Sequence, residues 1–425
     1  MASQSTVVSS ETGPSFVYRD GGAPRRSHGA DRGTLLGTAG VRGAVWILPL
    51  VAAFVIAART AGVTATQREY VVTAAAILLP CAAAALIAFA PRLRWSGTAC
   101  ALAASLMAVL VPFCVLVSLS GTRWYFAGPY YDQGFRVEYV TRFADSLRLH
   151  DYSYAHTAAF YNPAWFWLTG LSARIAGVAG WVAYKPAAVF TLWVAAVVTF
   201  AAWRRCVGPR RGALLTTVTC VALPSAAAAW LGAVTLLING VYEPYGWVVA
   251  APLPAFVCLW ARARGGLHLG RVVVIAFAVA LACWTYTEFG ALAGVGVVTL
   301  ALTAPERRER VLEAVAGLTG AGVLLAPWIV PFLVSWARVG LPHSVVGSFT
   351  NTESFGPLSF DPTLSPWSIV ALVGIVLLVA RGSGAVNRGL RHLGGLLVVA
   401  AVLQALLGVG GQGLHFHRLV LVGAL

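Results

Sequence analysis

Residues 97–119 read "GTACALAASLMAVLVPFCVLVSL" and contain no charged side chain. An apolar run of this length is enough for an α-helix to cross the hydrocarbon core of a bilayer, which takes about 20 residues. Similar runs recur along the 425-residue chain, which is 59% hydrophobic and only 11% charged, with a mean hydropathy of +0.77. The run therefore indicates one span of an all-α polytopic membrane protein.

Basic residues outnumber acidic ones by 30 to 15, which gives a formal net charge of +15. They lie in short loops between apolar runs, as is usual for cytoplasmic loops of membrane proteins, so we do not expect nucleic-acid binding. Lys185 is the only lysine. The seven cysteines have no paired spacing, and we expect neither a disulfide framework nor a metal site.

The positions of the basic loops orient the chain in the membrane. Residues 1–42 are polar and rich in Ser, Gly and Arg, which predicts a disordered cytoplasmic tail before the membrane domain at 43–425. In that domain we expect about eleven or twelve spans, each of roughly bilayer length. They are placed at 43–61, 71–90, 97–119, 186–203, 213–238, 246–261, two within 272–304 that meet at "TYTEFG", 314–336, 367–380, 392–410 and a shortened 419–425.

The span at 97–119 leads into an outer loop at 121–185, the first large one. Within this loop, residues 163–181 are aromatic at their start and interrupted by Arg174. Tryptophan and tyrosine favour the membrane–water interface, so this segment is predicted to be a juxtamembrane helix rather than a span.

Four of the fifteen acidic residues gather at 130–154, "YYDQGFRVEYVTRFADSLRLHDYSY". Near-helical spacing of aromatic and aliphatic residues from Phe135 to Leu147 predicts an amphipathic helix on the membrane surface. Glu138, Arg142 and Asp145 share another face at ion-pair spacing. We expect the charges of this helix mainly to face water or lipid headgroups, with Arg136 as a possible phosphate partner. The apolar stripe consists of Phe135, Tyr139, Phe143 and Leu147.

Asp132 precedes the apolar stripe, at the entrance of the predicted helix. A carboxylate there could cap the helix N-terminus. It also lies beside Gln133 and one turn from Arg136, at the expected membrane–water boundary. That arrangement suits a general base that acts on a hydroxyl with a cation nearby.

The motifs "DQGFRVEYVTRFADSLRLHDYSY" and "FYNPAWFWLTGLSARIAG…GWVAYKPAAV" resemble a known family. They are similar to the N-terminal membrane domain of the AftA-type galactan arabinofuranosyltransferases, actinobacterial cell-wall enzymes of the GT-C superfamily. The resemblance implies a GT-C transmembrane fold and an inverting transferase. Its expected donor is decaprenylphosphoryl arabinofuranose, a polyprenyl-phosphate sugar, and its expected acceptor is cell-wall galactan.

By the same resemblance, Asp132 is the catalytic carboxylate, and the site faces the outer side of the plasma membrane. Some related enzymes carry an Asp-Asp pair where this chain has Asp132 and Gln133, which argues for one catalytic acid and against a two-acid metal site. These relatives are also longer, so we expect a soluble C-terminal domain to be absent or truncated here.

Other polar residues near the expected outer ends of spans are candidates for substrate binding, because charge at membrane depth is costly. Glu243 and Glu288 could contact sugar hydroxyls between the tyrosines Tyr242, Tyr245 and Tyr286, or could be solvated loop carboxylates. The donor phosphate would be bound near "GGQGLHFHRL"; alternatively, this segment anchors the chain at the membrane interface. The candidate phosphate ligands are His415, His417, Arg418, Arg136, Arg142 and Lys185.

Two other interpretations remain open at this stage. A GT-C transferase could use another lipid-linked sugar, since the first-loop acid does not define the sugar. A polytopic lipid or solute transporter would show paired halves and midplane charges. Here the charges gather at one face, and the long outer loop has no counterpart in a second half.

Overall fold

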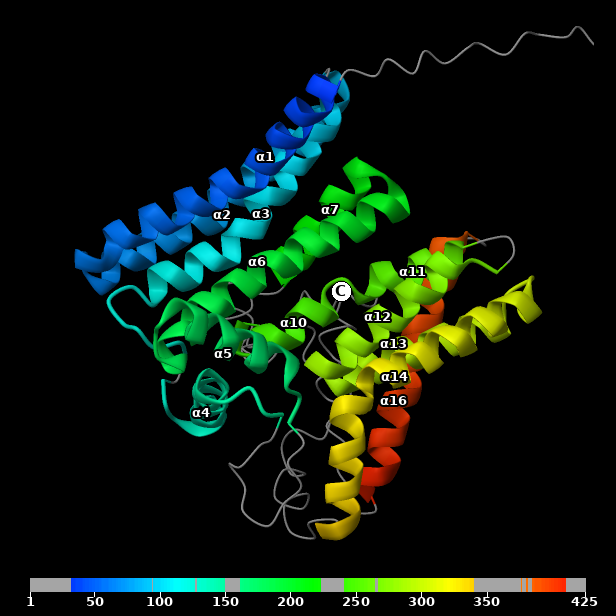
Figure 1. Ribbon diagram of the computed structural model, residues 1–425. Helices are drawn as coiled ribbons and strands as arrows, with labels where there is room; N and C mark the ends of the chain where they lie inside the picture. The colour runs from blue at the N-terminus through cyan, green and yellow to red at the C-terminus, as the bar shows by residue number, and fades with distance from the viewer. Residues whose placement is uncertain are drawn as a thin grey trace, which may run out of the picture. The chain divides into compact units, whose positions relative to one another are not determined.

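The computed structural model describes residues 32–149 except 94 and 127, 161–222, 241–263, 267–339 and 384–409, with Val376 and Ala380. Every regular element in that part of the chain is a helix, which confirms the all-α prediction. Contacts divide the chain into Met1–Gly43 and Ala44–Leu425, and the description below concerns the second unit. The α-helices (Figure 1) are α1 Arg32–Arg59, α2 Ala65–Phe89, α3 Ser96–Ser118, α4 Tyr131–Asp145, α5 Ala164–Ala176, α6 Gly180–Val207, α7 Pro209–Ala222, α10 Pro244–Ala250, α11 Leu253–Arg262, α12 Leu269–Thr285, α13 Thr287–Leu302, α14 Arg307–Val339 and α16 Ala385–Val409.

Six stretches of the described chain are long and apolar enough to cross a membrane, and α12 and α13 are shorter apolar helices. α12 and α13 meet at Tyr286, which confirms the predicted break at "TYTEFG". The expected spans at 367–380 and 419–425, and 213–238 beyond Ala222, lie almost wholly outside the described residues. The six stretches are Gly43–Gly62, Ala65–Arg92, Ser96–Ser118, Gly180–Val207, Pro244–Arg262 and Arg307–Ser335.

Apolar spans differ in how deeply the protein buries them. The most apolar part of α3 is 72% buried, because α3 packs against α2, α6 and α7, whereas the corresponding part of α2 is only 11% buried. α3 is therefore an interior helix, and α2 exposes most of its apolar surface to the bilayer.

Basic residues bind the carbonyl ends of neighbouring helices. Arg262 donates to the Cys206 carbonyl in the last turn of α6, and Arg310 donates to the Trp260 carbonyl in α11 at 2.6 Å. The last carbonyls of a helix have no intrahelical partner and carry partial negative charge. An arginine there supplies both a hydrogen-bond donor and a compensating positive charge. The basic loops that orient the protein thus also join its helices.

α4 packs against α5 and the start of α6, and two glycines allow this close approach. A Cβ atom at Gly170 would lie 2.4 Å from the Phe143 Cβ, and one at Gly180 would lie 2.4 Å from the Thr141 Cα. Tyr139 and Phe143 are buried in this contact. The prediction of a helix was correct, but its apolar stripe contacts protein rather than the membrane surface.

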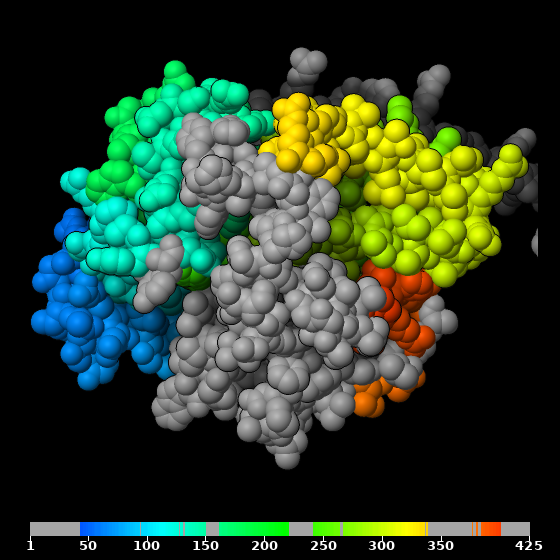
Figure 2. Space-filling view, turned by 90° about the horizontal axis from the view of Figure 1, so that it is seen from below, coloured from blue at the N-terminus to red at the C-terminus, as the bar shows by residue number. Residues whose placement is uncertain are grey.

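The segment after this helix also differs from the prediction. α4 ends at Asp145, so Leu147 lies beyond it and is exposed. α5 is a separate helix of 13 residues, as predicted for the juxtamembrane segment. The teal residues around α4 and the yellow residues of α14 appear on one face (Figure 2). The basic-loop topology assigns both α4 and the C-terminal end of α14 to the outer side.

Candidate active site

Asp132 lies in the first turn of α4, and its side chain is 71% exposed. The N-cap position is occupied by Tyr130, whose side chain makes no capping hydrogen bond, and Asp132 is the second residue of the helix. Its carboxylate lies 3.9 Å from the Arg136 guanidinium, one turn further along the helix. That distance allows electrostatic attraction but exceeds a hydrogen bond, and the carboxylate oxygens remain available to an incoming hydroxyl.

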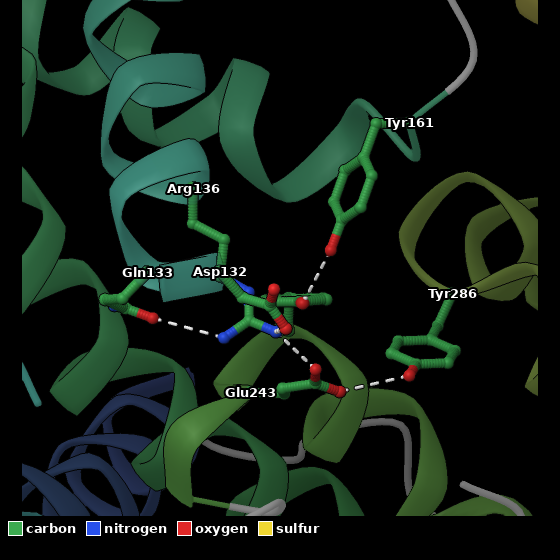
Figure 3. Close-up of polar contacts among 7 residues, drawn as sticks. Asp132, Gln133, Arg136, Tyr161, Glu243 and Tyr286 are labelled. Atoms are coloured by element: carbon green, nitrogen blue, oxygen red, sulfur yellow. Dashed lines mark hydrogen bonds and ion pairs between the residues drawn. The ribbon is translucent and has the colours of Figure 1, made fainter. Parts of the chain in front are cut away.

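Arg136 is the centre of a buried polar network (Figure 3). Its guanidinium is ion-paired and hydrogen-bonded to Glu243, the N-cap residue of α10, and donates to the Gln133 Oε1 at 3.2 Å. The Tyr286 hydroxyl, between α12 and α13, donates to the other Glu243 oxygen at 3.0 Å. The network therefore joins α4 to helices more than a hundred residues later in the chain.

The surroundings keep Arg136 charged although only 1% of its side chain is exposed. Burial works to lower the pKa of its guanidinium, but Tyr245 and Glu243 outweigh that effect and raise the pKa above its ordinary value. The guanidinium also lies over the Tyr242 ring, with its carbon 4.6 Å from the ring centroid. Arg136, which the sequence set apart from the other charges of this helix as a phosphate partner, is thus buried and paired with a carboxylate of the protein.

Aromatic side chains form the wall beside this network. The hydroxyls of Tyr245 and Tyr161 lie 2.9 Å apart, and the Tyr245 and Tyr286 rings are stacked with centroids 5.8 Å apart. Burial raises the pKa of the Tyr242 hydroxyl, against the opposing charge of Arg136. The network is thus enclosed on this side by rings that contribute hydroxyl groups.

Tyr161 and Asn162 were not among the predicted site residues. The Asn162 amide donates to the Cys283 carbonyl and the Thr287 hydroxyl, both at 2.7 Å, and so attaches the chain before α5 to the break between α12 and α13. The signal available in the sequence was "FYNP", an aromatic and amide pair just before a helix. Nothing in the sequence indicated its partner 121 residues away.

Other predicted binding residues have different surroundings. Arg142 is buried, contrary to the expectation for this helix, and donates to the Arg148 carbonyl. Lys185 donates to the Leu119 and Thr122 carbonyls at 2.6 and 2.8 Å, so it caps the end of α3. Glu288 is half-buried in the first turn of α13. The proposed phosphate ligands His415, His417 and Arg418 lie outside the described residues.

No group of three or more His, Cys, Asp or Glu side chains that could hold a metal ion occurs among the described residues. The polar chemistry of the site is instead that of one exposed carboxylate beside a buried, compensated arginine. The fold and this site define a polytopic helical membrane protein with an exposed carboxylate in the first turn of α4.

Comparison with known proteins narrows this class to one family. The sequence profile described as "Arabinofuranosyltransferase N terminal" matches residues 36–407, and the chain belongs to this family. The resemblance inferred from the first-loop motifs is therefore confirmed.

Similar curated proteins carry the name galactan 5-O-arabinofuranosyltransferase. The Corynebacterium glutamicum protein is 30% identical over 305 residues, which cover 68% of this chain and 43% of that protein. The Mycobacterium tuberculosis protein is 30% identical over 311 residues, 68% of this chain and 45% of its own length. The Mycolicibacterium smegmatis protein is 26% identical over 313 residues, 71% and 48% respectively. The chain thus spans about half the length of the curated relatives it matches.

Proposed function

We propose that this chain forms the membrane domain of a glycosyltransferase that transfers arabinofuranose from a polyprenyl-phosphate donor, decaprenylphosphoryl arabinofuranose, to cell-wall galactan. The exposed Asp132 carboxylate, held over the buried Arg136, is the observation that carries the proposal. The names of the relatives supply the sugar and the acceptor. The basic-loop topology supports a location at the extracytoplasmic face of the plasma membrane.

In the proposed reaction the Asp132 carboxylate accepts the proton of the acceptor hydroxyl. The hydroxyl oxygen then bonds to the anomeric carbon of the donor, and the bond from that carbon to the phosphate oxygen breaks. The lipid phosphate leaves with the electron pair. A single displacement of this kind inverts the anomeric configuration, and it needs only one carboxylate.

Arg136 is assigned the role of a positioning residue. It cannot contribute a full uncompensated positive charge, because Glu243 neutralises it. Its guanidinium lies 3.9 Å from the Asp132 carboxylate, a distance that leaves the carboxylate oxygens free of a direct hydrogen bond to it. Other groups then stabilise the negative charge of the leaving phosphate. The predicted ones remain His415, His417 and Arg418.

The proposal is tested by measuring arabinosyl transfer in membranes supplied with polyprenyl-phosphate arabinofuranose and a galactan acceptor. Asp132→Asn should lower kcat by about 10²–10⁴-fold, the usual contribution of a general base. The matched control is Glu69→Gln, another exposed carboxylate near the outer end of a span, which should retain wild-type activity.

Two results would each overturn one part of the proposal, either the role of Asp132 or the identity of the sugar. Asp132→Asn with activity within a few-fold of wild type would remove the general-base role. Transfer of a different lipid-linked sugar by the wild-type protein, with no transfer of arabinose, would identify a related transferase of other specificity.

A further inference from the structure

A hollow of about 510 Å³ lies on the side of α4 away from the Arg136 network. Asp145 and Arg136 are nine residues apart, and at about 100° per residue their side chains leave α4 in opposite directions. The hollow is therefore distinct from the network in Figure 3. Its lining residues are Trp124, Pro129, Gly134, Val137, Glu138, Thr141, Arg142, Asp145, Ser146 and Trp181.

Two tryptophans form one wall of the hollow. The rings of Trp124, in the loop after α3, and Trp181, at the start of α6, are stacked with centroids 4.7 Å apart and planes 25° apart. Both side chains are half-buried, so the pair presents a partly accessible apolar face. Such a face binds the C–H surface of a ring or chain without requiring charge.

The residues that α4 contributes to the lining carry hydrogen-bond acceptors. Glu138 and Asp145 are exposed, two turns apart on the same face of α4, and neither forms an ion pair with any other described residue. The Ser146 hydroxyl accepts from the Arg148 N–H, and the Thr141 hydroxyl donates to the Val137 carbonyl. Ionised carboxylates only accept hydrogen bonds, so this wall suits a ligand with many O–H donors.

The hollow is held in shape by close backbone packing. A Cβ atom at Gly134 would lie 2.5 Å from the Pro129 carbonyl oxygen, so the loop and α4 touch at one end of the hollow. Gly128 adopts φ +57°, a conformation that favours glycine, and its turn brings the loop back over Trp124. A wall fixed in this way loses little freedom when a ligand binds.

The charges select among possible ligands. Glu138 and Asp145 repel a phosphate or another anion. Among the described residues of the lining Arg142 is the one cation, and it is buried against the Phe143 ring and donates to the Arg148 carbonyl. An anionic lipid headgroup is therefore disfavoured here. Aromatic faces combined with unpaired carboxylates match an uncharged, hydroxyl-rich chain, which is the chemistry of a neutral polysaccharide.

We propose that this hollow binds the saccharide chain of the acceptor, which continues past the N-terminal end of α4 to reach Asp132. From Gly134 to Asp145 the groove follows α4 for about 17 Å, at 1.5 Å per residue, which suits an extended chain rather than one sugar. Its end at Gly134 lies in the first turn of α4, the turn that also carries Asp132, whose side chain leaves the helix on the Arg136 side. The assignment rests on the proposed transferase activity and adds the place where the acceptor is held.

The test uses the full chain in detergent or nanodiscs and compares galactofuranose oligosaccharides of increasing length. The double variant Glu138→Gln/Asp145→Asn changes exposed side chains and keeps their shape, so it should fold as wild type. Its KM for long acceptors should rise about tenfold or more, as expected for lost hydrogen bonds to charged groups. Its kcat, its KM for the shortest acceptor and its KM for the donor should be unchanged.

A second variant, studied by a direct measurement of binding, tests the acceptor site independently of transfer. Trp124→Ala should weaken binding of a long oligosaccharide, measured by calorimetry without any donor, and Trp124→Phe should restore part of the affinity. Glu69→Gln serves again as the control. Unchanged binding and unchanged KM for long acceptors in both variants would overturn the assignment, even where wild-type transfer is normal.

Failure of the transferase proposal would look different, because oligosaccharide binding by the wild type is measured independently of transfer. A rise in KM for the donor lipid, with the acceptor KM unchanged, would show that the hollow holds the donor and would also overturn the assignment.

Discussion

Glu243→Gln is expected to destabilise the protein strongly, although it changes a single atom. Glu243 neutralises Arg136, and both side chains are almost fully buried, with exposed fractions of 6% and 1%. Removing one charge of a buried pair leaves the other uncompensated, which typically costs about 3–5 kcal/mol. The hydrogen bonds from Arg136 to Gln133 and from Tyr286 to residue 243 persist in part, so we expect the lower half of that range.

Thermal unfolding in detergent, followed by tryptophan fluorescence, measures this loss. At about 2 °C per kcal/mol, the ratio for domains near 250 residues, the apparent Tm should fall by roughly 6–8 °C. Because membrane proteins often unfold irreversibly, the half-life at one fixed temperature should be compared as well. Asp132→Asn is the control, since an exposed side chain should shift stability by less than about 0.5 kcal/mol.

A double-mutant cycle separates the pair from its surroundings. Arg136→Met alone should cost as much as Glu243→Gln, while the double variant should cost less than their sum by about 0.5–3 kcal/mol. Strict additivity would show that the two charges are not coupled in the folded protein. A Tm for Glu243→Gln equal to that of the wild type would refute the placement of the pair in a buried site.

Three further predictions concern contacts elsewhere in the fold. Lys185→Met removes two hydrogen bonds to the end of α3 and should cost about 1–3 kcal/mol, seen as a lower apparent Tm; an unchanged Tm would contradict the capping role. Gly170→Val forces a side chain onto Phe143, and overpacking of this kind costs at least about 1–3 kcal/mol, so both the Tm and the rate of transfer should fall. Activity equal to that of the wild type would show that α4 need not pack on α5. Glu313→Gln removes the counter-charge that Arg271 and Arg310 share, each 2.8 Å from the carboxylate. The variant should have a shorter half-life at elevated temperature and an unchanged acceptor KM. A change in KM alone would show that the cluster takes part in substrate binding.

Several features of the site could be predicted from composition and local spacing. Asp132 stood out because a carboxylate precedes an aromatic stripe in a chain that otherwise avoids charge. The break at Tyr286 followed from length, since 272–304 is too long for one crossing. Both inferences depend on composition and local spacing, which need no knowledge of the neighbouring helices.

The role of Arg136 could not be obtained in the same way. On the helix it lies beside the apolar stripe, but the sequence does not show that Glu243, 107 residues later, neutralises it and so makes its burial possible. The same limit applies to Glu313, whose partners Arg271 and Arg310 lie on two helices. A charge is buried only where a distant counter-charge reaches it, and that pairing is a property of the fold.

The amino-acid sequence alone determined that this chain is a helical membrane protein, which side of the bilayer its loops favour, and to which family it is similar. These follow from hydropathy, charge and motifs, which depend only on local sequence and need no knowledge of the fold. Tertiary structure decided which apolar faces meet protein instead of lipid. α2 and α3 are both long apolar spans, yet the most apolar part of α3 is 72% buried and that of α2 only 11%. Lipid and protein are almost equally apolar neighbours, so hydropathy does not distinguish the two helices, and only their packing in the fold does.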